Sequence, residues 1–301
     1  HDDLIEQVLI GRYGNYDLPK VHFESAQQTD FDSELGQMVF KLEKPLASGE
    51  SLTFTTQFSV KSNKLWIETL NQAIKPEFSN LRGIPLLPTI GYQPRYELTN
   101  NQLRVNYSLP TKQESKPSFI LASGAPEQAK YNWITMDTRL SVDEGYAGLT
   151  QGELIKTWTQ GDRSYYEYSA NTAFRAIPTW TAVPFKAKSA KLNNTRVSVL
   201  TKHDNEAVDV NLAAMQDTLL WFEQNVQAYS YKQLTLVNSP DLQSTGYALP
   251  QIMFIADTVG FRASPLSDAG FDQRYRRAVH ETAHQWFGHS IGNGVDSDSA
   301  F

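Results

Sequence analysis

The sequence predicts an α+β chain with more than one domain. We expect an all-β domain over residues 1–190, built as a sandwich or an open saddle, and an α+β domain over residues 191–301. The first part alternates apolar and polar residues between frequent turns, which is the period of half-buried strands. The second part places a helical apolar repeat between short apolar runs. A polar, lysine-bearing stretch from Ala187 to Asn194 separates the two parts.

Composition narrows the classes of function. Hydrophobic residues make up 40% of the chain and aromatic residues 12%, which is enough for substantial cores. There is no cysteine, so disulfides, thiolate metal ligands and a cysteine nucleophile are excluded. A net charge of −6 without long charge runs gives no sign of nucleic-acid binding. No apolar stretch reaches the roughly 18 residues of a membrane helix, and His1-Asp2-Asp3 does not begin a signal peptide. We expect both ends to be cuts in a longer protein.

Within the first part, three patterns predict strands. Apolar residues at alternate positions predict one strand over 52–60 and another over 103–109, the second ending before a proline. Two runs rich in β-branched and aromatic residues, 154–159 and 165–168, flank Gly161-Asp162. This arrangement predicts a β-hairpin.

Two features of this part have more than one interpretation. The apolar segment 84–92 contains two prolines, and we interpret it as a buried connection between domains rather than as a loop of a substrate cleft. The aromatic residues could form a platform for a carbohydrate or peptide, but alternating aromatics in strands are more often core and cross-strand pairs. The residues concerned are Trp133, Trp158, Tyr165, Tyr166, Tyr168, Trp180 and Phe185.

The second part begins with a predicted strand over 196–200, followed by a long helix. Apolar residues recur in steps of four and three from Val208 to Val226, which is the repeat of an amphipathic helix. Asp204 or Asn205 is the expected N-cap, because both side chains accept hydrogen bonds from the first free amides of a helix.

Two further strands are expected over 234–237 and 252–255, where short apolar runs occur. A loop containing Gly, Pro and Ser follows over 260–270. A second helix should begin near Asp272. This last helix carries the most informative motif of the chain.

That motif is His280-Glu281-x-x-His284. Helix positions four apart lie only about 40° from one another, so both imidazoles can bind one zinc ion at roughly 2.0–2.1 Å. Glu281 borders this face without being a ligand, which suits a general base acting on zinc-bound water. The alternative, three ordinary polar residues on a solvated face, is disfavoured because apolar neighbours surround the motif and predict a buried helix. His289 should point about 140° away from the metal face, and we interpret it as structural.

The run from Val279 to Gly288, Val-His-Glu-x-x-His-Gln-Trp-Phe-Gly, resembles the gluzincin aminopeptidases, the group of aminopeptidase N and leukotriene hydrolase. The extended metzincin pattern is absent, since Phe287 and Ser290 stand where it needs Gly and His. The resemblance implies a thermolysin-like α+β catalytic domain after a saddle-shaped β domain. It also implies a third zinc ligand, a Glu on the next helix, just beyond Phe301, and a transition-state Tyr further on.

The second half also resembles the peptidase module attached to some bacterial multispanning ABC-type permeases. The segment from Gly83 to Leu98, with its Leu-Pro-Thr-Ile-Gly-Tyr core, adds to this likeness. The resemblance implies a membrane-associated bacterial protein with this chain on the extracytoplasmic, periplasmic side. The expected partners are a peptide substrate and the membrane-spanning remainder of the same protein, and no nucleic acid.

The family pattern is broken at the amine anchor. Gluzincin aminopeptidases carry a Gly-x-Met-Glu-Asn motif on an edge strand, and its Glu binds the free α-amine of the substrate. The corresponding stretch, 246–254, has no acidic residue, and none occurs between Asp241 and Asp257. Burying an ammonium group without a carboxylate is costly. The aminopeptidase activity that the resemblance implies is therefore in question, while the zinc chemistry is not.

Three hypotheses follow. The first is a zinc metallopeptidase with Glu281 as general base, aminopeptidase-like but without the amine-binding Glu. The second is a catalytically silent, peptidase-like binding or regulatory module of a membrane transporter assembly. The third is a zinc hydrolase acting on a non-peptide bond. The intact Glu281 favours the first. We expect these 301 residues alone to bind zinc weakly and to be inactive, unless Asp296 or Asp298 supplies a third ligand.

Overall fold

A computed structural model describes residues 4–11, 20–33, 36–61, 72–91, 98–112, 133–241, 245–264, 270 and 272–291. The chain divides into two compact units, residues 1–61 with 83–116 and residues 62–82 with 117–301. The predicted boundary near residue 190 falls inside the second unit and stays a prediction. None of the described helices combines the length and the apolar character needed to cross a membrane.

The first unit consists mainly of antiparallel strands. One sheet has the order β3-β4-β1-β8, and β2 pairs with β5. Its core contains Ile10, Phe23, Met38 and Phe40. The elements are β1 (Ile5–Gly11), β2 (Lys20–Phe23), β3 (Ala26–Asp32), β4 (Gln37–Leu46), β5 (Phe54–Gln57), α1 (Gly83–Leu86), β8 (Thr89–Ile90) and α2 (Asn101–Asn106).

Two predictions in this unit need correction. The segment 103–109 is not a strand, because it contains most of α2 and the turn after it. The Asn100 side chain accepts a hydrogen bond from the amide of Leu103 and so caps this helix. Arg104 is the buried residue of the segment and donates to two backbone carbonyls, while the alternating apolar side chains are exposed. The strand expected over 52–60 is shorter, and the described part of 84–92 contains α1 and β8.

Two sheets of the second unit are antiparallel, with orders β10-β13-β7-β6 and β11-β12-β9. The predicted hairpin is confirmed: Gln160 pairs with Arg163 across Gly161-Asp162. The cross-strand aromatic pair Trp158 and Tyr165 stacks at 5.0 Å between ring centroids. The strands are β6 (Gln72–Lys75), β7 (Phe78–Arg82), β9 (Trp133–Asp143), β10 (Ala147–Leu149), β11 (Glu153–Gln160), β12 (Arg163–Arg175) and β13 (Thr179–Val183).

A five-stranded sheet with the order β14-β15-β16-β18-β17 completes the second unit. The three inner strands are parallel, and the two edge strands are antiparallel to their neighbours. The predicted strands at 196–200, 234–237 and 252–255 are confirmed. The elements are β14 (Lys186–Leu192), β15 (Thr195–Thr201), α3 (Glu206–Asn225), β16 (Gln233–Ser239), β17 (Gly246–Leu249), β18 (Ile252–Ala256), α4 (Asp257–Gly260) and α5 (Gln273–Ala283).

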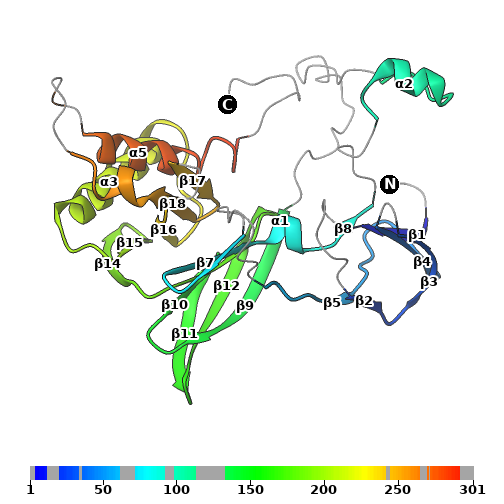
Figure 1. The fold of residues 1–301 in the computed structure, drawn as a ribbon, viewed down its shortest axis with the longest axis horizontal. Coiled ribbons are helices and arrows are strands. Elements are labelled where there is room, and N and C mark those ends of the chain that lie inside the picture. The colour runs from blue at the N-terminus through cyan, green and yellow to red at the C-terminus, as the bar shows by residue number, and fades with distance from the viewer. Residues whose placement is uncertain are drawn as a thin grey trace. The chain divides into compact units, whose positions relative to one another are not determined.

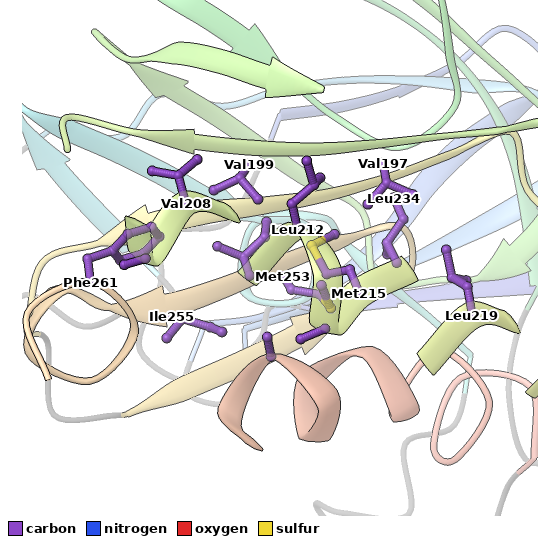
Figure 2. Close-up of a cluster of buried hydrophobic side chains, with 14 of the residues drawn as sticks. Val197, Val199, Val208, Leu212, Met215, Leu219, Leu234, Met253, Ile255 and Phe261 are labelled. Atoms are coloured by element: carbon purple, nitrogen blue, oxygen red, sulfur yellow. The ribbon is translucent and has the colours of Figure 1, made fainter. Parts of the chain in front are cut away.

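The helices α3 and α5 lie side by side over one face of this sheet (Figure 1). Asn205 caps α3 by accepting from the amide of Ala207, which decides between the two expected caps. Leu212 and Met215 point from α3 into the core, where the inner strands contribute Val199 and Met253 (Figure 2). Each such side chain stabilises the fold by roughly 1.5–3 kcal/mol on full burial. This core fixes α5 against the sheet.

Candidate functional site

The start of α5 is held by a cap and an ion-pair network. Asp272 accepts a hydrogen bond from the amide of Arg274 at 2.9 Å, so the helix begins where the sequence predicts. The buried guanidinium of Arg274 pairs with Asp272 at 2.8 Å and with Glu206 of α3 at 3.1 Å. The helix that carries the motif is therefore tied to α3 at its first turn.

The end of α5 is anchored by Trp286. Its ring stacks on Phe222 of α3 at 4.4 Å, and its indole N–H donates to the carbonyl of Gln227 at 3.0 Å. The helix ends at Ala283, so His284 is the C-cap residue and the chain turns directly after it. His280 thus lies in the last turn, and His284 directly follows it.

The two imidazoles are close together, with ring centroids 4.8 Å apart and planes perpendicular. Nδ1 of His284 lies 3.1 Å from the carbonyl oxygen of Phe287, to which it can donate. With the proton on Nδ1, Nε2 is left as a lone-pair donor, the usual arrangement of a metal-binding histidine. Burial, with the neighbouring His284, Arg277 and Arg276, lowers the pKa of His280. Neutral imidazole is the form that binds a metal.

Glu281 is buried, with 2% of its surface exposed. Burial raises the pKa of its carboxyl group, opposed by the hydrogen bond and charge of Arg277, whose Nη1 lies 3.3 Å from Oε1. On its other side the carboxylate lies against Gly246 of β17. The two are so close that a Cβ atom added to that glycine would overlap Oε1. The acid is therefore held between an arginine of its own helix and the backbone of an edge strand.

Gln285 joins α5 to this edge strand, and sequence reasoning missed it. Its Oε1 accepts from the amide of Gln251 at 2.8 Å, and its Nε2 donates to the carbonyl of Leu249 at 3.0 Å. Gln251 has φ of 67° and accepts at its own side chain from the amide of Gly152 at 3.0 Å. A polar side chain directly after the second histidine, next to the apolar pair at 286–287, was the available signal.

The stretch 246–254, whose sequence contains no acid that could bind an α-amine, is apolar over most of its length. Leu249 and Ile252 are fully buried, and the ring of Tyr247 lies 4.3 Å under the guanidinium of Arg82. An acid from the β-rich part, such as Asp143 or Glu97, could in principle replace the missing amine anchor. Asp143, at the end of β9, pairs with Arg163 at 2.6 Å. Glu97 lies outside the described residues.

His289 has buried ring nitrogens. Burial, with the charge of Arg175 as the next cause, lowers its pKa to about 3. Arg175 itself donates to the carbonyl of Gly288 at 2.5 Å. The imidazole of His289 is therefore neutral near pH 7, and its structural role stays a prediction.

The described residues bring His280, Glu281 and His284 together, but they do not complete a metal centre. Among them, no group of three or more His, Cys, Asp or Glu side chains is placed to hold a metal ion. Asp296 and Asp298, considered as further ligands, lie outside the described residues.

Comparison with known proteins finds similarity only in structure. No protein-family model matches the sequence, and no curated protein matches it. A crystal structure of a two-domain M1 zinc metallopeptidase, a mutant bound to L-arginine, superposes with a TM-score of 0.53 at 13% identity. The crystal structure of an M1 zinc metallopeptidase from Deinococcus radiodurans superposes with a TM-score of 0.52, also at 13% identity. Each match covers 96% of this chain and 58% of the other, so this chain spans little more than half their length. The likeness shows a peptidase-like fold, shared with M1 zinc metallopeptidases.

Proposed function

We propose that this chain belongs to a zinc metallopeptidase in which His280 and His284 bind the metal and Glu281 is the general base. One observation carries the proposal: two adjacent imidazoles and a buried carboxylate lie together on α5, and that carboxylate contacts an edge strand. The fold shared with M1 metallopeptidases supports it. The catalytic part would be a thermolysin-like α+β domain.

The imidazoles of His280 and His284 are suitable zinc ligands. Zinc accepts imidazole nitrogen, and a catalytic site uses three protein ligands with one open position. The hydrogen bond from His284 to Phe287 orients one ring and leaves Nε2 for the metal. On this proposal the third ligand is a carboxylate outside the described residues. When bound, zinc supplies a Lewis acid that polarises the scissile carbonyl and acidifies water.

The residues of the chain then have distinct tasks. Glu281 takes a proton from the attacking water and gives it to the leaving amine. Burial suits this task, because a raised pKa brings the carboxyl group closer to the pH at which it must both accept and release a proton. The edge strand β17 can pair with an extended peptide through its backbone, beside the carboxylate of Glu281.

We further propose that the enzyme does not depend on a free N-terminus. The stretch 246–254 contains no carboxylate that could bind an α-ammonium group. Arg82, stacked on Tyr247 of β17, is a cation and cannot take that role.

The second candidate is a silent binding module of a membrane transporter assembly on the periplasmic side. The missing amine anchor favours it, since an enzyme that has lost its binding group can persist as a binding domain. The buried Glu281 argues against it, because burying a carboxylate costs stability and a module without catalysis has no evident need for this one.

The deciding experiment uses the full-length protein loaded with zinc and compares Glu281→Gln with wild type. Glu281→Gln should abolish peptide hydrolysis and retain zinc, whereas His280→Ala should lose both. Glu144→Gln, a neutralisation at the exposed turn after β9, is the matched control and should keep full activity. Peptide hydrolysis that survives Glu281→Gln would refute the proposed mechanism. A zinc-loaded wild type without any hydrolysis would favour the silent module.

A further inference from the structure

The five-stranded sheet has a second face, which the candidate active site does not use. On β14, Lys188 pairs with Asp209 of α3, and Ala190 and Leu192 pack against the core below that helix. Side chains alternate between the faces of a strand, so Ser189 and Lys191 project from the opposite face. That face lies away from α3 and α5.

Two cations face each other there. Lys191 and Arg196 are directly opposite across the antiparallel pair of β14 and β15. Opposite residues have Cβ atoms about 4.5–5.5 Å apart, and like charges at such positions are destabilising. Both side chains are exposed, and within the described part of the chain no carboxylate forms an ion pair with either. A hairpin that only needed to protect a sheet edge would be more stable with one of these charges replaced by an acid.

The same two residues line a pocket of about 440 Å³. Lys232, directly before β16, adds a third cation to the wall, and Glu153 is the acidic residue among those lining it. These two form an ion pair at 2.7 Å. The lining therefore keeps a net positive charge, carried by the facing pair.

Neutral polar groups also line the pocket, beside the apolar residues Leu154 and Ala190. Ser189 lies in the pocket wall, and its hydroxyl is hydrogen-bonded to that of Ser198 at 2.8 Å. Asn194 also lines the pocket, as does Gln233, whose Nε2 donates to the carbonyl of Thr150 at 3.2 Å. Hydroxyl and amide groups donate hydrogen bonds to oxyanions. The volume lies within the roughly 300–1,000 Å³ of pockets that bind small molecules.

We propose that this pocket binds a small molecule through a phosphate group. A phosphate dianion neutralises both facing cations and turns a repulsive pair into a cooperative site. The planar guanidinium of Arg196 can bind two phosphate oxygens at once, while the Lys191 ammonium acts as a point charge. The site shares no residue with α5 or β17, so it stands independently of the proposed peptidase activity.

Isothermal titration calorimetry in a phosphate-free buffer tests this, with inorganic phosphate and phosphoserine as probes and ionic strength held constant with chloride. Both probes should bind saturably, and phosphoserine more tightly if the organic part also contacts the wall. Arg196→Gln and Lys191→Gln should each weaken binding by about tenfold, the effect of one lost charged hydrogen bond. Lys186→Gln removes the same charge from the other face of β14 and should change nothing.

Thermal unfolding provides a second readout. Without phosphate, Arg196→Gln and Lys191→Gln should raise the melting temperature, because each removes the repulsion. On addition of phosphate, the melting temperature of wild type should rise more than that of either variant. Equal binding by wild type and both pocket variants would mean an adventitious ion only and would overturn the proposal, as would no saturable binding of either probe. If one pocket variant fails to fold, the other decides.

Discussion

The carboxylate of Glu281 lies directly against Gly246, so closely that a side chain at residue 246 would overlap Oε1. Gly246→Ala should therefore displace Glu281 without touching the metal ligands. We expect kcat/KM of the zinc-loaded protein for peptides to fall by about 100-fold, the scale of a 1 Å misplacement in a catalytic group. Zinc content, measured alongside, should not change. Full activity of Gly246→Ala would show that the close approach of residue 246 does not hold Glu281 in its catalytic position.

Gln285→Ala should destabilise the protein. The change leaves the buried amide of Gln251 and the buried carbonyl of Leu249 without their partner. Leaving each of the two buried groups unsatisfied costs about 1–3 kcal/mol, so the free energy of unfolding should fall by roughly 2–6 kcal/mol. Chemical denaturation measures it, with Gln160→Ala at the exposed end of β11 as the matched control. A loss of stability as small as that of the control would mean that the two hydrogen bonds of Gln285 do not stabilise the fold.

N-acetylated peptides should be cleaved at least as well as their free-amine counterparts. The stretch 246–254 has no carboxylate to pair with an ammonium group, and Asp143 is occupied by Arg163. The measurement is kcat/KM on matched peptide pairs with the zinc-loaded protein. Losing a charged anchor costs about 1.5–3 kcal/mol, so a preference of about tenfold or more for the free amine would reveal an anchor and contradict the proposal.

We expect the metal-free protein to become less stable as the pH decreases, and His289 to cause part of this loss. Its pKa is about 3 in the folded protein and about 6.5 in the unfolded chain. Between these values the unfolded state binds the extra proton, so stability is lost as the pH falls below about 6.5. His289→Phe removes this dependence. Its melting temperature should decline less between about pH 7 and pH 4 than that of wild type, and parallel declines would show that His289 does not contribute.

Hydrophobic periodicity predicted the elements that carry the site. The long repeat in α3 was correct because burial on one side dictates its spacing. The short apolar runs at 234–237 and 252–255 were correct because both faces of β16 and β18 are buried. The same reasoning failed at 103–109, because the apolar residues there are exposed. The segment is helical instead, stabilised by the Asn100 cap and by the hydrogen bonds of Arg104.

Within the site, the sequence predicted the three motif residues and the start of their helix. It could not predict the contacts made through Gly246 or Gln285. Both depend on how closely β17 approaches α5, which is a tertiary relationship with no local pattern. The facing cations Lys191 and Arg196 were missed for another reason. The stretch containing the first of them looked like a linker, whereas it is an edge strand whose lysines also discourage edge-to-edge association.

The end of α5 at Ala283 has an electrostatic consequence. The aligned peptide dipoles of a helix leave roughly half a negative elementary charge at its C-terminal end, concentrated in the last turn. His280 lies in that turn and His284 directly follows it. Any cation held by the two imidazoles would therefore rest at the negative pole of the helix, which attracts cations before a single ligand bond has formed.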